Sequence, residues 1–154
     1  MRYRCPKFFQ HQAEAMLVGC IDFRFWEITG QFVAENVAPL VDAFNIPGAA
    51  KNFLEEGNLF ARSAIAAIQK SIDLHKIGSI ILMAHWDCGG YGGSKKFASP
   101  TAEEAAYRDD LMEAQKKLAA LFPLLNVRAG YSRLAPKTEW ADPAVAEIEF
   151  VMIN

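Results

Sequence analysis

Short apolar segments alternate with helical patterns along this chain. Three runs, 15–21, 39–46 and 79–84, have the length of strands, and the third is uninterrupted. Continuous apolar runs of this length are typical of strands that are covered on both faces, as in a parallel sheet. Two further runs, 126–131 and 148–153, alternate with polar residues. We therefore expect these two to form strands at the edges of the same sheet.

One helix is predicted between the second and third runs. Asn58 is a candidate N-cap, and Gly78 is expected to stop the segment just before the third strand. The residues that recur at three- and four-residue spacing on one face are Ala61, Ile65, Ile68, Ile72 and His75. This spacing predicts an amphipathic helix that packs one face on the sheet.

A second helix is predicted after the third run, and a shorter one after the first. Thr101 and Glu104 form a capping-box pattern, which predicts a helix start at Thr101, and Pro123 ends the segment. The shorter helix is expected within 25–37, where Gly30 weakens the pattern.

The order strand, helix, strand implies right-handed crossovers and a mostly parallel sheet. At 154 residues and 17.1 kDa the chain fits one domain, and 52% hydrophobic residues supply enough apolar material for a core. We predict a single α/β domain over residues 1–154, with a mostly parallel central sheet of four to five strands flanked by helices.

Charge and cysteine content narrow the function classes. The formal net charge of −2 excludes a strongly basic nucleic-acid binder and charge-driven membrane association. The three cysteines, Cys5, Cys20 and Cys88, are odd in number and widely scattered, which disfavours a disulfide scaffold. We therefore expect reduced thiols and a cytoplasmic location. The polar N-terminus leads into no long apolar stretch, so we expect neither a signal peptide nor a membrane span.

Candidate chemistry follows two of the predicted strands. Cys20-Ile21-Asp22-Phe23-Arg24 closes the first run, and if the strand stays extended, positions 20, 22 and 24 point to the same side. His85-Trp86-Asp87-Cys88-Gly89-Gly90 follows the strongest run. Ligands of open α/β sheets bind in the crevice outside the carboxyl ends of the strands. Both segments therefore reach the edge of the sheet where a site is expected.

The residue types in these segments favour a metal. Cys20, His85 and Cys88 together supply two thiolates and one imidazole, a set that favours Zn²⁺ in tetrahedral geometry. Three protein ligands leave one position open, as in catalytic zinc sites, and the distant Cys5 is a weaker candidate for closing it. Spacing alone leaves another interpretation open, in which the cysteines fill the core and His85 is simply hydrogen-bonded.

Taken together, the two segments resemble the signature of the β-class carbonic anhydrases. That signature is Cys-x-Asp-x-Arg, followed several tens of residues later by His-x-x-Cys and usually Gly, and the similarity covers residues 15–95. The chain is short for the family. It also departs from the family pattern at 45–48, where it has Asn-Ile-Pro-Gly in place of Arg-Asn-Ala-Gly.

The resemblance implies a β-carbonic-anhydrase-like fold and one Zn²⁺ per chain. The implied zinc ligands are Cys20, His85 and Cys88. Asp22 and Arg24 correspond to the catalytic dyad, and Gly89 to the glycine where main-chain groups approach the substrate. The implied activity is reversible hydration of carbon dioxide to bicarbonate by a zinc-bound hydroxide that the dyad orients. The family also implies a homodimer or higher homo-oligomer. The net charge leaves no nucleic-acid or membrane partner to expect.

Three other functions stay open on the sequence. The same zinc site is compatible with hydrolysis of carbonyl sulfide or carbon disulfide. A divergent homologue could instead bind zinc without catalysis. A zinc-free protein could use Cys88 with His85 as a thiol-dependent hydrolase.

Overall fold

A central sheet covered by helices organises the described part of the chain, which comprises residues 1–2, 4–5, 7, 9–137, 141–142 and 144–153 of a computed structural model. The elements, with η for 3₁₀ helices, are β1 (Ala15–Gly19), α1 (Trp26–Asn36), β2 (Val41–Asn45), η1 (Ala49–Leu54), α2 (Leu59–His75), β3 (Ser79–Ala84), η2 (Gly89–Tyr91), η3 (Ser94–Lys96), α3 (Pro100–Leu121), β4 (Asn126–Leu134) and β5 (Ile148–Ile153).

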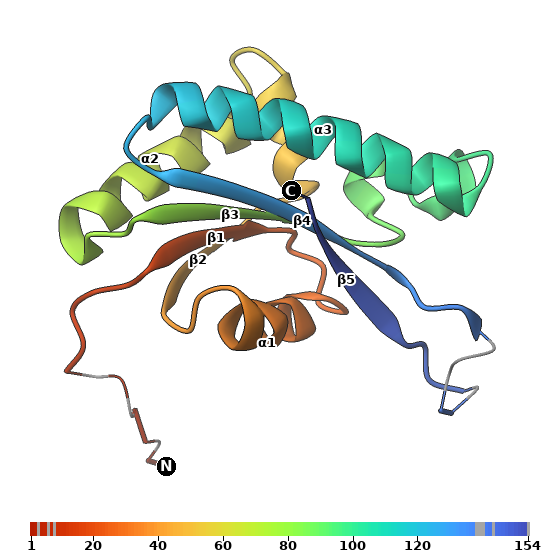
Figure 1. The fold of residues 1–154 in the computed structure, drawn as a ribbon, viewed down its shortest axis with the longest axis horizontal. Helices are drawn as coiled ribbons and strands as arrows, with labels where there is room; N and C mark the ends of the chain where they lie inside the picture. The colour runs from red at the N-terminus through yellow and green to blue at the C-terminus, as the bar shows by residue number, and fades with distance from the viewer. Residues whose placement is uncertain (3, 6, 8, 138–140, 143, 154) are drawn as a thin grey trace.

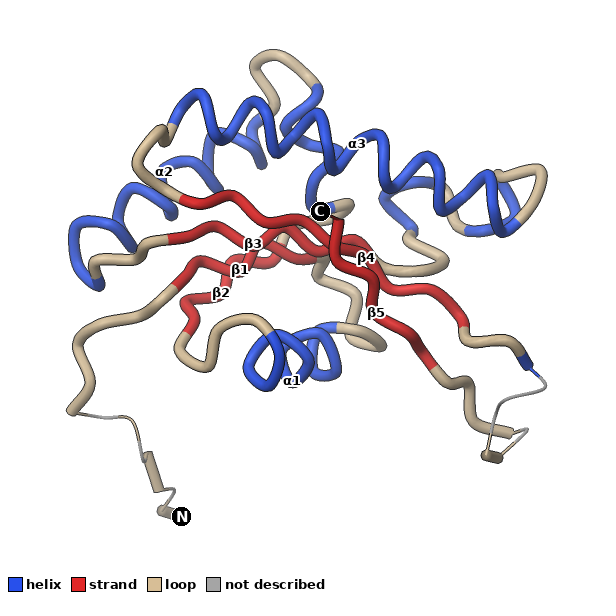
Figure 2. The backbone as a smooth tube through the Cα atoms, in the orientation of Figure 1, coloured by secondary structure: helices blue, strands red, loops and turns tan. Residues whose placement is uncertain are grey.

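The sheet has five strands in the order β2-β1-β3-β4-β5. The first four are parallel to their neighbours, and β5 is antiparallel to β4. Helices α2 and α3 cover one face and α1 covers the other (Figure 1, Figure 2). The predicted fold class, an α/β domain with a mostly parallel sheet, is confirmed. The chain passes from β1 through α1 to β2 on one side of β1. It then passes through α2 to β3 on the other side, so the order of the strands changes direction at β1.

Side chains of the central strands alternate between two apolar cores. In β1, Met16 and Val18 pack with the core under α2 and α3, whereas Ala15 and Leu17 pack with the core under α1. The same alternation continues in β3, and both strands are buried almost throughout. Burial on both faces explains why these two runs lack polar interruptions.

The N-terminus of α2 forms as predicted, but its C-terminus does not. The Asn58 side chain accepts hydrogen bonds from two backbone N–H groups of the first turn, at 2.9 and 3.1 Å. The helix ends at His75 because Lys76 adopts a left-handed conformation with φ 59°. The prediction that Gly78 stops this helix is therefore wrong.

Helix α3 begins earlier than predicted. The Ser99 hydroxyl accepts the N–H of Ala102 at 3.1 Å, and Pro100 occupies the first turn, where its missing N–H costs nothing. The predicted capping box at Thr101 is therefore wrong, and Glu104 bonds to strand β4 instead. The shorter predicted helix is confirmed as α1. Among the helices in the described ranges, none has both the length and the apolar character to cross a membrane.

Strand β4 lies inside the sheet, which contradicts its predicted edge position. It pairs with β3 on one side and β5 on the other, and β5 is an edge strand as predicted. Polar residues of β4 make internal hydrogen bonds, among them Arg128, which lies in the run that was predicted as an edge strand. Arg128 donates to the carbonyl of Val37 at 3.3 Å, and the Ser132 hydroxyl accepts the N–H of Trp86 at 3.3 Å.

Candidate metal centre

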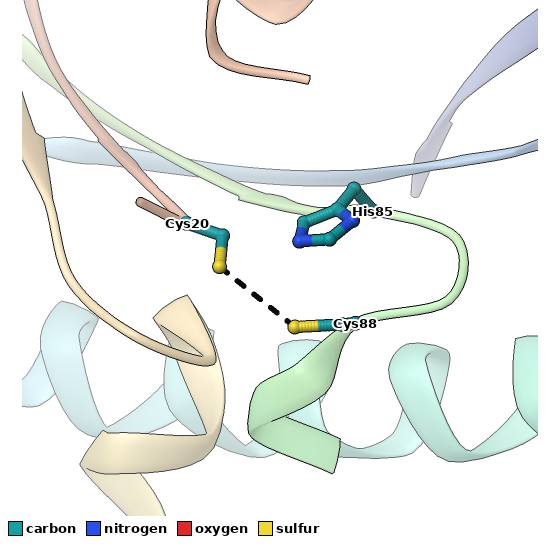
Figure 3. A group of neighbouring side chains, drawn as sticks. All are labelled: Cys20, His85 and Cys88. Atoms are coloured by element: carbon teal, nitrogen blue, oxygen red, sulfur yellow. Dashed lines mark hydrogen bonds between the residues drawn. The ribbon is translucent and has the colours of Figure 1, made fainter. Parts of the chain in front are cut away.

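The two predicted segments meet at one edge of the sheet. Cys20 directly follows β1, and His85 directly follows β3, with Cys88 three residues further on. Because β1 and β3 are neighbouring parallel strands, their carboxyl ends lie side by side. The order of the strands changes direction at this point. Such topological switch points are the usual ligand crevices of open α/β sheets. Figure 3 shows the three side chains converging.

The sulfur atoms of these side chains are spaced like two ligands of a tetrahedrally coordinated ion. The sulfur atoms of Cys20 and Cys88 are 3.8 Å apart, and all three donor atoms lie within 4.8 Å of one another. Two sulfurs bound to one tetrahedral zinc at about 2.3 Å lie about 3.8 Å from each other. Cys88 and His85 are buried, and Cys20 is half-buried. The ligand set therefore fits a zinc ion in composition, and the two sulfurs fit it in spacing.

His85 turns an unpaired nitrogen toward the sulfurs. Its Nδ1 lies 2.8 Å from the carbonyl oxygen of Trp86, which only accepts, so Nδ1 carries the proton. Its Nε2 is buried and has no hydrogen-bond partner in the described part of the chain. The ring is held by stacking on Phe25, with centroids 4.3 Å apart. Metal-binding histidines typically bond through the other ring nitrogen in this way, which leaves the ligand lone pair free.

The pKa values of the two thiols are shifted in opposite directions, which favours one thiolate and one thiol. A hydrogen bond from Cys88 lowers the pKa of Cys20 to about 4, aided by His85 and by the backbone N–H groups of Gly48 and Asp22. The hydrogen bond to Cys20 and burial raise the pKa of Cys88. A cation between the sulfurs would favour the loss of the second proton as well.

Asp22 reaches the site through a turn. The condition that the strand stays extended as far as Arg24 is not met, because β1 ends at Gly19. The carbonyl of Asp22 accepts the N–H groups of Phe25 and Trp26, both at 3.1 Å, which starts the turn into α1. The turn places Asp22 Oδ2 3.9 Å from the Nε2 of His85.

Arg24 holds the Asp22 carboxylate at both oxygens. Its Nε donates to Oδ1 at 3.0 Å and its Nη2 to Oδ2 at 2.7 Å. These hydrogen bonds lower the pKa of Asp22 to about 2, so the carboxylate is ionised and acts only as an acceptor near neutral pH. The same guanidinium donates through Nη1 to Asp87 Oδ2 at 3.0 Å and through Nη2 to the Asp87 carbonyl at 3.2 Å. Arg24 thus ties the turn after β1 to the loop after β3.

A hollow of about 570 Å³ opens beside the sulfur of Cys20. Its lining residues are Cys20, Ile21, Asp22, Phe23, Arg24, Pro47, Gly89 and Gly90. Gly90 allows the close approach on one side, since a Cβ atom there would lie 2.5 Å from the Cα of Gly48. Gly89 also borders the hollow, but a Cβ atom at this position would meet nothing within 4 Å.

Two residues on α3 support the loop that carries His85 and Cys88, and sequence reasoning did not find them. The carboxylate of Glu103 accepts the N–H of Asp87 at 2.8 Å and the hydroxyl of Tyr107 at 2.6 Å. The Tyr107 oxygen in turn accepts the N–H of Cys88 at 3.2 Å. The sequence contains one signal for Glu103. Glu103 is a carboxylate at the head of a buried stripe that continues at the spacing of an apolar helix face through Tyr107, Leu111, Ala114 and Leu118.

Comparisons with known proteins assign the chain to a family. A protein-family model described as "Putative carbonic anhydrase" matches residues 10–132, which include both segments of the metal centre. An uncharacterized protein of Rickettsia bellii is 26% identical over 122 residues, covering 76% of this chain and 74% of that protein. An uncharacterized protein of Rickettsia conorii is 25% identical over 122 residues, covering 76% of this chain and 66% of that protein. No solved structure matches at a significant level. Because the family model spans well over half of the chain's length, this chain belongs to the family with that description.

Proposed function

We propose that this protein is a zinc-dependent lyase that reversibly converts carbon dioxide and water into bicarbonate and a proton. The observation that carries the proposal is the convergence of two sulfurs and one unpaired, buried imidazole nitrogen beside an ionised carboxylate. Membership of the carbonic anhydrase family supports the same activity. All three cysteines are free, which supports a reducing compartment such as the cytoplasm.

In the proposed mechanism, Cys20, His85 and Cys88 would hold the metal. Two thiolates and one imidazole are a soft donor set that suits zinc better than magnesium or calcium. Bound zinc with an open position lowers the pKa of a coordinated water and so supplies a nucleophile near neutral pH. His85 keeps its proton on Nδ1 through the carbonyl of Trp86, so its Nε2 remains available as a ligand.

Asp22 is proposed to orient the attacking water. Its carboxylate lies beside the donor atoms and is held at both oxygens by Arg24, so it offers a fixed acceptor for an O–H group. Accepting that hydrogen bond turns an oxygen lone pair of the water toward the carbon of the substrate. The paired geometry also favours Asp22 as a partner of Arg24 over Asp22 as a fourth metal ligand.

The hollow beside Cys20 is the proposed substrate site. Ile21, Phe23 and Pro47 give it apolar walls suited to an uncharged, linear triatomic molecule. Gly89 borders it without a side chain, so its main chain is proposed to face the bound substrate. Arg24 lies on the same wall and provides positive charge near the bicarbonate that forms.

Two measurements on the purified protein test this function. We expect about one zinc per chain without added metal, and carbon dioxide hydration well above the buffer rate in stopped-flow assays. His85→Ala should lose the zinc and the activity, whereas His11→Ala, which changes an exposed histidine away from the site, should keep both. A zinc-free wild type would contradict the proposal. A zinc-loaded wild type that releases hydrogen sulfide from carbonyl sulfide without hydrating carbon dioxide would replace the substrate.

We also propose that the active form is a homodimer or a higher homo-oligomer. Three large apolar side chains beside the site, Ile21, Phe23 and Trp26, are 57%, 81% and 56% exposed. A second copy of the chain covering them would remove this apolar surface from water. Sedimentation equilibrium should give a multiple of 17.1 kDa, and Phe23→Ser should weaken association. A monomer at all concentrations would contradict this part of the proposal.

A further inference from the structure

The peptide unit between Trp86 and Asp87 is hydrogen-bonded at both ends. Its carbonyl accepts the Nδ1–H of His85 at 2.8 Å, and its N–H donates to the Oε1 of Glu103 at 2.8 Å. A planar peptide fixed at its N–H end is also fixed at its carbonyl end. The carboxylate of Glu103 therefore determines where the acceptor for the His85 ring lies, although it does not touch the ring.

The next peptide along the loop is held from the same helix. The N–H of Cys88 donates to the hydroxyl oxygen of Tyr107 at 3.2 Å, and that hydroxyl donates its own proton to Glu103 Oε1 at 2.6 Å. Glu103 and Tyr107 lie four residues apart on α3 and so share one face of the helix. Two consecutive backbone N–H groups of the loop, those of Asp87 and Cys88, are thus bound by one buried pair of side chains.

The burial of Glu103 would be unfavourable if this residue served only to pack the core. Glu103 and Tyr107 are both fully buried, and Glu103 lies on a helix stripe that is otherwise mostly apolar. Its second oxygen, Oε2, has no hydrogen-bond partner among the residues that the structure describes. Burying a carboxylate with an unsatisfied oxygen is unfavourable, whereas an apolar side chain of similar size would continue the stripe without that cost. The carboxylate stabilises the loop through its hydrogen bond to the backbone of Asp87. Asp87 adopts a left-handed backbone conformation with φ 53°.

We propose that Glu103 and Tyr107 are positioning residues of the metal centre. Glu103 acts through the Trp86–Asp87 peptide to fix the tautomer and orientation of His85. Tyr107 acts through the N–H of Cys88 to fix the backbone that carries the second sulfur. This inference rests on the metal-binding part of the proposed function. Partners one layer behind the ligands change metal affinity by about 10- to 100-fold in other metalloproteins.

The test compares two variants with two matched controls. Tyr107→Phe removes only the hydroxyl, and Glu103→Met removes both acceptor oxygens while keeping a side chain of similar size. Tyr131→Phe and Glu104→Met make the same chemical changes in a second Tyr–Glu pair, whose hydrogen bond is 3.3 Å long and which bonds none of the three metal-ligand residues. The zinc dissociation constant is measured by competition with a chromophoric chelator. The absorption bands of the Co²⁺-loaded proteins report ligand geometry, and urea unfolding of the metal-free proteins reports stability.

Both site variants should bind zinc about 10- to 100-fold more weakly and shift the Co²⁺ bands, while the controls match wild type. A folded Tyr107→Phe with the affinity and Co²⁺ spectrum of wild type would overturn the role of Tyr107, and the same result for Glu103→Met would overturn that of Glu103. Loss of stability without any change in affinity would show a structural role only and would also overturn the proposal.

A measurement on the wild type guards against variants that do not fold. In the zinc-loaded protein, ¹⁵N NMR should show His85 protonated at Nδ1 and slow to exchange. Protonation at Nε2, or rapid exchange at Nδ1, would overturn the inference. Failure of the proposed function appears separately, since a zinc-loaded wild type that does not hydrate carbon dioxide refutes the activity and leaves the ratios of zinc affinity intact.

Discussion

At the scale of single residues, Asp22 is the side chain whose charge the proposed chemistry needs most. Asp22→Asn keeps the shape but replaces one acceptor oxygen by an NH₂ donor. We expect the variant to keep its zinc, because the donor atoms are unchanged, and to lose about 10²- to 10⁴-fold in carbon dioxide hydration. Stopped-flow rates together with metal content check this. Asp73→Asn, at an exposed position on α2, is the control that should remain fully active.

The pairing of Asp22 with Arg24 also predicts how stability depends on pH. The pKa of Asp22 is lowered from 3.8 to about 2, so the folded state binds the proton less tightly than the unfolded state does. The stabilisation is therefore fully present above the unfolded value, and it is lost as the pH falls through the folded value. Urea unfolding between pH 5 and pH 2 should show a steeper loss of stability in wild type than in Asp22→Asn. Parallel curves for the two proteins would contradict the shift.

The residues of the site divide into those that spacing reveals and those that only the fold reveals. Cys20, His85 and Cys88 could be predicted to converge, because each follows a buried strand and the carboxyl ends of parallel strands meet. Glu103 could not be placed behind them, since its bond to Asp87 depends on a left-handed loop conformation and on where α3 crosses that loop. The capping-box pattern also drew attention to Glu104, the wrong neighbour.

At the scale of elements, two adjacent glycines at the start of η2 have different requirements. A Cβ atom on Gly90 would lie 2.5 Å from the Cα and 2.7 Å from the N of Gly48, whereas one on Gly89 would meet nothing within 4 Å. Gly90→Ala should therefore push the turn after β2 away from the metal centre. We expect a cost of about 1–3 kcal/mol in unfolding free energy together with weaker zinc binding.

Gly89→Ala is the matched control for that change. It adds the same methyl group one residue earlier and should leave unfolding free energy and zinc content close to those of wild type. Denaturant unfolding and metal analysis of both variants check the pair. Equal destabilisation by the two substitutions would contradict the close approach of Gly90 to Gly48.

The start of α3 gives a second contrast between neighbouring positions. Ser99 caps the helix through its hydroxyl, so Ser99→Ala should lower the unfolding free energy by about 1 kcal/mol. Thr101→Ala lies inside the first turn and should cost less, because alanine is the better helix former there. Thermal unfolding of the two variants distinguishes them. A larger loss for Thr101→Ala would restore the cap that the sequence pattern predicted.

Strand and helix identity could be predicted, but element ends and strand neighbours could not. The uninterrupted run at 79–84 could be assigned as a strand and the periodic run before it as a helix, because burial determines the spacing of apolar residues along the sequence. The place of β4 depends instead on a partner strand, β5, which is separated from β4 by 13 residues and runs antiparallel to it. Arg128 in β4 appeared solvent-facing because its internal acceptor, the carbonyl of Val37, lies 91 residues away in the sequence.

At the scale of the whole molecule, the proposed metal joins the carboxyl ends of β1 and β3, whose connection runs through α1, β2 and α2. A ligand that binds only the folded state stabilises it by about 4 kcal/mol when its free concentration is about 1,000 times the dissociation constant. Removing zinc with a chelator should therefore lower the midpoint of thermal unfolding by roughly 10 °C for a chain of this size.

Cysteine variants locate that stabilisation in the site. Cys20→Ser should abolish most of the zinc-dependent shift, because a hydroxyl is a poorer ligand for zinc than a thiolate. Cys5→Ser, at an exposed cysteine, should keep the full shift. The shift in the wild type should also reverse when zinc is restored. Identical unfolding midpoints with and without the metal would show that the three donor atoms converge for another reason, since an ion bound there has to stabilise the fold that assembles its ligands.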